Sequence, residues 1–319
     1  MTDAGLMEDV VARGASDPSV PNKETSKQFR SNLVLQMLAM IGLGAMLWPS
    51  GANWVSSLFH DGEISGYTAA VDKMTENERV DALEAAREYN RQLPAGLMQD
   101  PFNFDEDREE AAINAYMQVL KVNGTDAMGS LSYPALSISL PIYHGTGEEV
   151  LRKGVGHVYG SSLPVGGPGT HTVLTSHSGQ MHASLFDNLL KAKLGQTFQI
   201  TVLGEPRCYM VDQVLVVKPE EVEHLQVIDG QDYATLITCT PIGVNFHRQL
   251  VRGVRVEAPD ILGGGGAIAG DGAIPSFPWW LVAFIAGSLG VAYLLFDSSC
   301  EKCPPRHKAE YKPGSEGTL

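Results

Sequence analysis

The stretch Tyr233-Ala234-Thr235-Leu236-Ile237-Thr238-Cys239 has the composition of a short β-strand, and it ends in a cysteine. Nine residues later the chain reaches Arg248, after a segment that begins with Thr240-Pro241. Upstream, a second strand-like run over residues 172–177 ends in His177. A thiol, an imidazole and a guanidinium can together carry out acyl transfer through a thioester. We therefore predict a nucleophilic site at these strand ends.

The chain has 319 residues and a formal net charge of −14. This length has room for one large domain or two small ones. A strongly acidic chain argues against nucleic acid as a partner, because phosphate binding requires clustered Lys and Arg. We interpret the excess acid as a solubility feature.

Two apolar stretches, residues 33–48 and 279–296, match the ~17–25 residues needed to cross a bilayer, the first when residues 49–59 extend it. A cleaved signal peptide is the alternative for the first stretch, but a long polar leader precedes it and no clear small-x-small site follows closely. Basic residues flank the two stretches on the sides of the chain termini, namely Lys23, Lys27, Arg30, Lys302, Arg306, Lys308 and Lys312. By the positive-inside rule, both termini are cytoplasmic and the intervening residues lie outside. We predict a two-pass cell-membrane protein with an extracytoplasmic domain.

The segment between the predicted anchors changes character along its length. Apolar residues at three- and four-residue spacing predict a helix over 67–93, which Pro94 and Gly96 end, and a second helix over 109–122. From Leu131 onward, short β-rich runs alternate with Gly and Pro clusters. Leu136 to Leu140 alternates apolar and polar residues, as a half-buried strand does. Further predicted strands cover residues 171–176, 197–203, 207–217, 234–239 and 249–256, and a short helix covers 183–194. Strands of this spacing indicate an antiparallel barrel or sandwich.

The predicted organisation has seven parts. They are a disordered leader 1–30, a transmembrane anchor 31–56, N-terminal helices 57–128, a β-domain 129–260, a Gly-rich linker 261–277, a second anchor 278–297 and a cytoplasmic tail 298–319.

Each candidate residue has a plain structural alternative. Cys239 could form a disulfide with Cys208, because exported proteins commonly carry such bridges. His177 is one of nine histidines, but it differs in ending an apolar strand, where an imidazole can protonate a leaving amine. Arg248 could be a surface ion-pair residue, an interpretation that fits the two later arginines of the same strand better. As a functional group, Arg248 would favour the thiolate of Cys239 and stabilise an oxyanion.

Cys300 and Cys303 form a single CxxC pair beyond the second apolar stretch. Without a second pair, a zinc site is not favoured over a solvated thiol pair or a lipid attachment site. We predict no metal site and no cofactor.

The motifs resemble those of the sortase family. The run Thr235-Leu236-Ile237-Thr238-Cys239 matches the TLxTC signature, the arginine of the family falls on Arg248, and residues 175–177 resemble its histidine strand. The likeness is close to continuous from about residue 130 to 258. It implies a sortase-type closed β-barrel, antiparallel or mixed, with short helices. It also implies Cys239, His177 and Arg248 as catalytic residues and Thr238 as a substrate-binding residue.

Further features resemble class C sortases, which polymerise pilins. The runs 140–146 and 154–157 are typical of that class, and Tyr89-Asn90 resembles a motif of its N-terminal helix. Asp100, Pro101 and Phe102 resemble the lid that plugs the active site of class C members. Two membrane anchors also suit this class. The chain departs from the family pattern at Ser176 and Ser178, where the family usually has Gly before its histidine and Arg after it.

The resemblance implies a definite reaction. Cys239 attacks a Thr–Gly type bond in an LPxTG-like sorting signal, and His177 protonates the leaving amine. Arg248 steadies the oxyanion, and a lysine amine of another pilin subunit resolves the thioester. The expected partners are therefore LPxTG-bearing pilins, the acceptor lysine and the membrane. One alternative is a housekeeping sortase that uses a cell-wall precursor. Another is a non-enzymatic exported β-domain, stapled by a Cys208–Cys239 disulfide.

Overall fold

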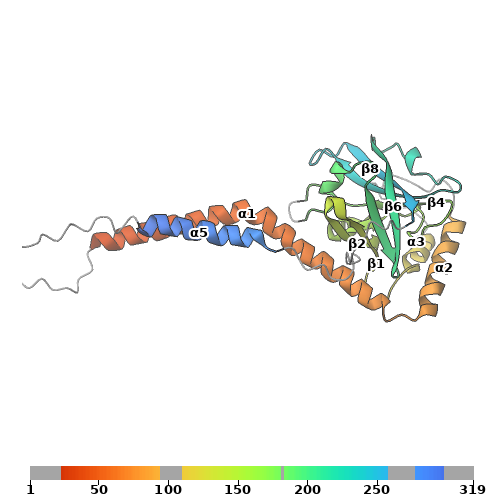
Figure 1. Cartoon of the computed structure of the whole chain (residues 1–319), viewed down its shortest axis with the longest axis horizontal. Helices are drawn as coiled ribbons and strands as arrows, with labels where there is room; N and C mark the ends of the chain where they lie inside the picture. Colours follow the sequence, from red (N-terminus) through yellow and green to blue (C-terminus); the bar gives the residue numbers. More distant parts are fainter. Residues whose placement is uncertain (1–22, 94–109, 181–182, 258–276, 298–319) are drawn as a thin grey trace, which may run out of the picture. The chain divides into compact units, whose positions relative to one another are not determined.

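The computed structural model describes residues 23–93, 110–180, 183–257 and 277–297, and Figure 1 shows its elements. The chain divides into two compact units, one of which runs from Pro49 to Pro278. The other unit combines the residues up to Trp48 with those from Trp279 onward. The catalytic candidates all lie in the unit 49–278.

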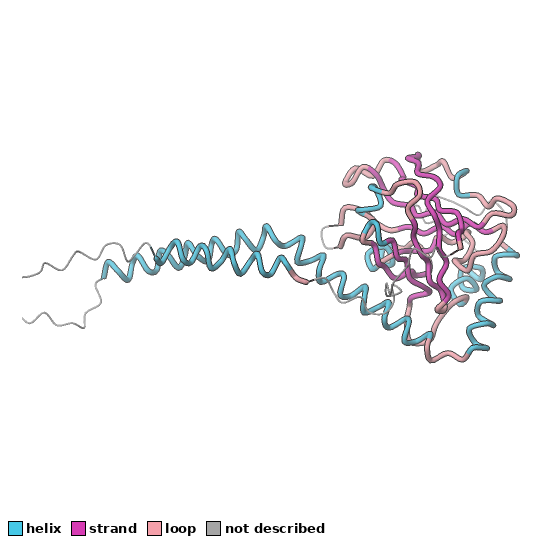
Figure 2. The backbone as a smooth tube through the Cα atoms, in the orientation of Figure 1, coloured by secondary structure: helices cyan, strands magenta, loops and turns pink. Residues whose placement is uncertain are grey.

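This unit is built on a closed barrel of eight strands, drawn in magenta in Figure 2. Around the barrel the strands follow the order β1-β2-β3-β4-β7-β8-β6-β5. Two neighbouring pairs, β2 with β3 and β4 with β7, are parallel, and the other pairs are antiparallel. The bounds are β1 Ala127–Tyr133, β2 Ile138–His144, β3 Val155–His157, β4 Thr170–Thr175, β5 Thr197–Val202, β6 Glu205–Val217, β7 Asp232–Thr240 and β8 His247–Val256. The prediction of a closed, mixed β-barrel is confirmed.

Strands β4 and β7 of the barrel are buried on both faces. In β4, for example, Leu174 packs in the main core, whereas Val173 packs in a second apolar cluster. Leu225, in the short 3-10 helix η3 (Glu223–Leu225) after β6, belongs to the second cluster. All six residues of β4 are therefore buried. Strands buried on both faces have near-continuous apolar runs, which is why β4 and β7 stand out in the sequence.

Several elements differ from the sequence-based prediction. Strands β1 and β3 and the helix α4 (Glu148–Lys153) were not predicted. The predicted strand 136–140 begins only at Ile138, because residues 134–136 form the 3-10 turn η1 and Ser137 has a φ of +54°. The predicted helix 183–194 is reduced to the 3-10 helix η2 (Asp187–Lys191). The second predicted helix is shorter than expected, as α3 (Glu110–Gln118).

The predicted helix 67–93 is two helices. Its first residues belong to the end of α1 (Lys23–Val71), and the rest forms α2 (Glu76–Gln92), which begins after Thr75. Thr75 accepts a hydrogen bond from the backbone of Glu78, whose carboxylate accepts from the backbone N–H of Thr75. This reciprocal capping box starts a new helix and explains the break. Its Thr-x-x-Glu signature was visible in the sequence.

Hydrogen bonds from tyrosine side chains connect the N-terminal helices to the barrel. Tyr67 of α1 donates to the carbonyl of Met128 at 2.9 Å and accepts from the N–H of Leu203 at 2.8 Å. Tyr116 of α3 lies 2.8 Å from Nδ1 of His157, and burial lowers the pKa of His157 to about 4. These contacts hold the helices in a fixed position on the barrel.

Asn90 connects helix α2 to the barrel domain, because its side-chain amide makes two hydrogen bonds to the backbone of Leu163. Its Nδ2 donates to the carbonyl of Leu163 at 3.1 Å, and its Oδ1 accepts from the N–H of Leu163 at 2.7 Å. We predict that Asn90→Ala lowers the free energy of unfolding by about 1–3 kcal/mol, because the buried N–H of Leu163 loses its acceptor, whereas the Leu163 carbonyl keeps its hydrogen bond from the N–H of Val165. Chemical denaturation measures this loss. Gln92→Ala is the matched control, because the side chain of Gln92 donates to Glu88 of the same helix. Equal stability of the two variants would contradict the prediction.

The other unit contains the first half of α1 and the helix α5 (Trp279–Asp297), which contact each other. Asn32 donates from Nδ2 to the carbonyl of Leu295 at 2.7 Å, and Gln36 donates from Nε2 to that of Ser288 at 2.9 Å. Among the described residues, α1 and α5 are the helices that are long and apolar enough to cross a membrane.

Candidate active site

The strand register brings His177 and Cys239 to the same end of the barrel. Strands β4 and β7 run parallel, with Thr175 opposite Ile237. Beyond this pair, Thr238 donates from Oγ1 to the carbonyl of Ser176 at 3.0 Å. His177 directly follows Ser176, and Cys239 directly follows Thr238. Two residues far apart in sequence are thus level with one another on neighbouring strands.

Arg248 joins them from the third strand. It lies directly opposite Cys239 in the antiparallel pair of β7 and β8. Its Nη1 donates to the Sγ of Cys239 at 3.5 Å and to the carbonyl of Asn245 at 3.1 Å. Cys239 and Arg248 are 7% and 9% exposed, and the side chain of His177 is 20% exposed. A cation held beside a mostly buried thiol favours the thiolate, which is the reactive form.

The loops that follow β4 and β7 contact each other closely. Ser178 donates from Oγ to the carbonyl of Cys239 at 2.8 Å. Gly179 has a φ of +78°, and a Cβ at this position would lie 2.5 Å from Cγ2 of Ile242. Only glycine fits both the conformation and the close approach. The N–H of Gly179 also donates to Asp187 at 2.6 Å, so the loop after His177 is fixed on two sides.

The two cysteines of this unit are far apart. Cys208 and Cys239 are both free. They lie opposite Val256 and Arg248, eight residues apart along β8. At about 3.3 Å per residue this separates them by roughly 26 Å, whereas a disulfide requires Cα atoms within about 7 Å. The alternative of a Cys208–Cys239 staple is therefore wrong. Burial raises the pKa of the Cys208 thiol, which makes it a poor nucleophile.

The sequence and fold of this unit are similar to those of known proteins. A family model described as "Sortase domain" matches residues 131–256. The crystal structure of sortase C-1 from Actinomyces oris is 42% identical, with a TM-score of 0.55; the match covers 57% of this chain and 99% of that one. The chain belongs to the sortase family. A second solved sortase, described as a pilus-related sortase C of Group B Streptococcus, is 42% identical over 61% of this chain and 97% of its own, with a TM-score of 0.55. These structural neighbours are class C sortases.

A curated sortase is also similar, at greater distance. Sortase A of Streptococcus agalactiae serotype III (strain NEM316) is 28% identical over 123 residues. The match covers 38% of this chain and 49% of that protein, so the chain spans about half the length of this relative.

The remaining predicted site residues are Thr238 and the three residues of the expected lid. Thr238 is fully buried, and its hydroxyl joins β7 to the end of β4. Its role in substrate binding stays a prediction. The expected lid, Asp100, Pro101 and Phe102, lies outside the described residues.

Two residues around the sortase histidine were not predicted to contribute. Glu148 of α4 lies with Oε2 3.1 Å from Nε2 of His177. Ser178, noted in the sequence only as a departure, contacts the main chain of the candidate nucleophile. No sequence signal indicated Glu148, because the helix that carries it was not predicted.

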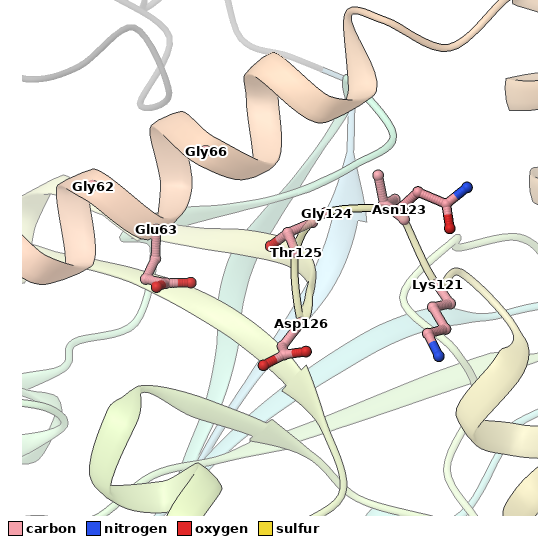
Figure 3. Close-up of a pocket in the computed structure, with 9 residues that line it drawn as sticks. Gly62, Glu63, Gly66, Lys121, Asn123, Gly124, Thr125 and Asp126 are labelled. Carbon is pink, nitrogen blue, oxygen red and sulfur yellow. The ribbon is translucent and has the colours of Figure 1, made fainter.

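Figure 3 shows a polar cavity between helix α1 and the loop that precedes β1, with a volume of about 430 Å³. Helix α1 contributes Glu63 and two glycines to its wall, and residues 121–126 form the opposite side. Burial raises the pKa of the neighbouring Tyr143, and the carboxylates of Glu63 and Asp126 raise it further. None of the three catalytic candidates lines this cavity.

Proposed function

We propose that the chain is a membrane-anchored cysteine transpeptidase in which Cys239, His177 and Arg248 perform the chemistry. The observation that carries the proposal is the meeting of these three residues at the ends of β7, β4 and β8. The register pair of Cys239 with Arg248 and the 3.5 Å contact between Nη1 and Sγ support it most directly.

The proposed reaction has two halves. The Cys239 thiolate attacks the carbonyl carbon of a Thr–Gly type bond in an LPxTG-like signal, and the oxygen becomes an oxyanion. Arg248 stabilises that charge, since its guanidinium is already oriented by the Asn245 carbonyl. His177 gives a proton to the leaving amine as the C–N bond breaks, which leaves a thioester on Cys239. In the second half, an incoming amine loses a proton to His177 and attacks the thioester carbonyl, which releases the thiolate.

The acceptor that we propose is a lysine amine of a pilin subunit. Two solved neighbours support this choice, because one is a pilus-related sortase C of Group B Streptococcus and the other is a sortase C of Streptococcus pneumoniae described in relation to pilin substrate specificity. The two long apolar helices support membrane anchoring. The basic residues on the terminal sides of the two apolar stretches support an orientation with both termini cytoplasmic and the barrel outside. An amine of a cell-wall precursor, the acceptor of the housekeeping alternative that the sequence left open, is the other acceptor that the experiment compares.

The experiment incubates the full chain in detergent micelles with an LPxTG peptide and follows the protein by intact mass spectrometry. We expect a covalent adduct that has lost the peptide's C-terminal fragment and that hydroxylamine removes, as a thioester requires. Adding a pilin lysine peptide or an amine of the wall-precursor type then identifies the acceptor by the product formed. Peptide hydrolysis without any adduct would contradict the thioester mechanism.

A further inference from the structure

Glu148 contacts the candidate general acid from outside the three-strand site. It is the first residue of α4, the short helix that connects β2 to β3. Its Oε2 lies 3.1 Å from Nε2 of His177, and its Oε1 accepts from Nε of Arg152 at 2.9 Å. The carboxylate therefore bridges a guanidinium and the imidazole. The residues in this contact are 29 positions apart in the sequence.

The helix that carries Glu148 is fixed relative to the end of β4. Ser176, which immediately precedes His177, donates from Oγ to the carbonyl of Gly154 at 2.6 Å, just after α4 ends. Gly154 itself is tightly packed, because a Cβ there would lie 2.7 Å from the carbonyl oxygen of Pro141. Helix α4 thus contacts the histidine strand at both of its ends, through Glu148 and through Gly154.

The charge state of Glu148 decides which imidazole nitrogen carries a proton. The hydrogen bond from Arg152 is the main cause that lowers the pKa of Glu148, and the bond with His177 lowers it further. An ionised carboxylate has no proton to donate and can only accept. In this contact, therefore, Nε2 of His177 must be the donor.

Titratable or charged groups near the His177 loop also come from three further elements. They are Asp187 of η2, Cys239 of β7 and Arg248 of β8. Asp187 is engaged with the N–H of Gly179, and Arg248 with Cys239 and the Asn245 carbonyl. A hydrogen bond joins the carboxylate of Glu148 to the imidazole directly.

We propose that Glu148 is a positioning residue for His177: it accepts the Nε2 proton and makes Nδ1 the nitrogen that exchanges a proton with the leaving and incoming amines. The proposal rests on the proposed transpeptidase function. A carboxylate that orients a catalytic imidazole in this way fixes both its tautomer and its rotation. It does so without touching the substrate.

The chain offers a matched control one residue away. Glu149 accepts from Nζ of Lys153 at 2.9 Å, as Glu148 accepts from Arg152, and both pairs span one helical turn. Glu149 lines a hollow on the side of Tyr143 and His144. Glu149→Gln therefore removes an equivalent surface charge and ion pair while it leaves the contact with His177 in place.

The kinetic test compares Glu148→Ala, Glu148→Gln and Glu149→Gln in the full chain in micelles, with Cys239→Ala as the inactive reference. We expect Glu148→Ala to lower kcat for LPxTG peptide cleavage by about 10-fold or more, as loss of a histidine's orienting partner does elsewhere. KM should stay within about two-fold, because no substrate contact is lost. Glu148→Gln should retain more activity than Glu148→Ala, since its amide oxygen can still accept from Nε2–H. Equal kcat values for Glu148→Ala and Glu149→Gln would overturn the proposal.

A second measurement tests the tautomer independently of activity. Heteronuclear NMR of histidine ring nitrogens in the micelle-bound chain reports which nitrogen is protonated, and a His177→Asn spectrum assigns the signal. We expect the Nε2–H form in the wild type and in Glu149→Gln, and its loss in Glu148→Ala. An Nδ1–H form in the wild type would overturn the proposal. If the wild type forms no thioester, the proposed function fails, while this spectrum still decides the role of Glu148.

Discussion

Replacing Cys239 with alanine is expected to abolish the acyl-enzyme and to leave the barrel folded. The thiol is the group that forms the covalent bond, so no other contact can substitute for it. The side chain is small and lies at the end of β7, where alanine keeps the strand and its pairing with β8. Intact mass spectrometry with an LPxTG peptide measures the adduct, and thermal unfolding measures the fold.

Cys208 provides the control for this prediction. It is also buried in the barrel wall, but it lies near the opposite end of β8 and its thiol has a raised pKa. Cys208→Ser should therefore form the adduct at the wild-type rate. A persistent adduct in Cys239→Ala, or its loss in Cys208→Ser, would exclude Cys239 as the nucleophile.

The strands that carry the site could be predicted from the sequence because they are buried on both faces. Val173 and Leu174 of β4 point to different apolar clusters, as do Leu236 and Ile237 of β7, and both strands therefore consist of apolar and β-branched residues. The same pattern marks where each strand ends, and it made His177 and Cys239 candidate site residues. Pairing could not be predicted in this way, because register depends on contacts between distant segments.

The elements that could not be predicted are short or depend on tertiary contacts. Helix α4 has six residues, four of them charged, and no amphipathic pattern can develop over so short a stretch. Its functional contact, between Glu148 and His177, exists only because β2, β3 and β4 are neighbours in the barrel. Ser178 shows the same limit, since its sequence position says nothing of the Cys239 carbonyl that it contacts.

Replacing Arg248 with alanine is the other change with a large expected effect. The guanidinium lies between the thiol and the Asn245 carbonyl, in a mostly buried position where charge is poorly screened by water. Without the guanidinium, both the thiolate and the oxyanion of the tetrahedral intermediate lose its electrostatic stabilisation. We expect kcat/KM for peptide cleavage to fall by at least about 100-fold, the size of the loss when one oxyanion donor is removed.

Lysine at position 248 separates charge from geometry. Lysine keeps the positive charge but lacks the planar fork that can donate in two directions at once. Arg248→Lys should therefore recover only part of the lost activity, in the same steady-state cleavage measurement. Arg255→Ala serves as the control on the same strand, because Arg255 lies over the Tyr209 ring at 5.7 Å, toward the other end of β8. Full activity in Arg248→Lys would show that charge alone suffices, and the directed contact from Nη1 would then have no part in stabilising the oxyanion.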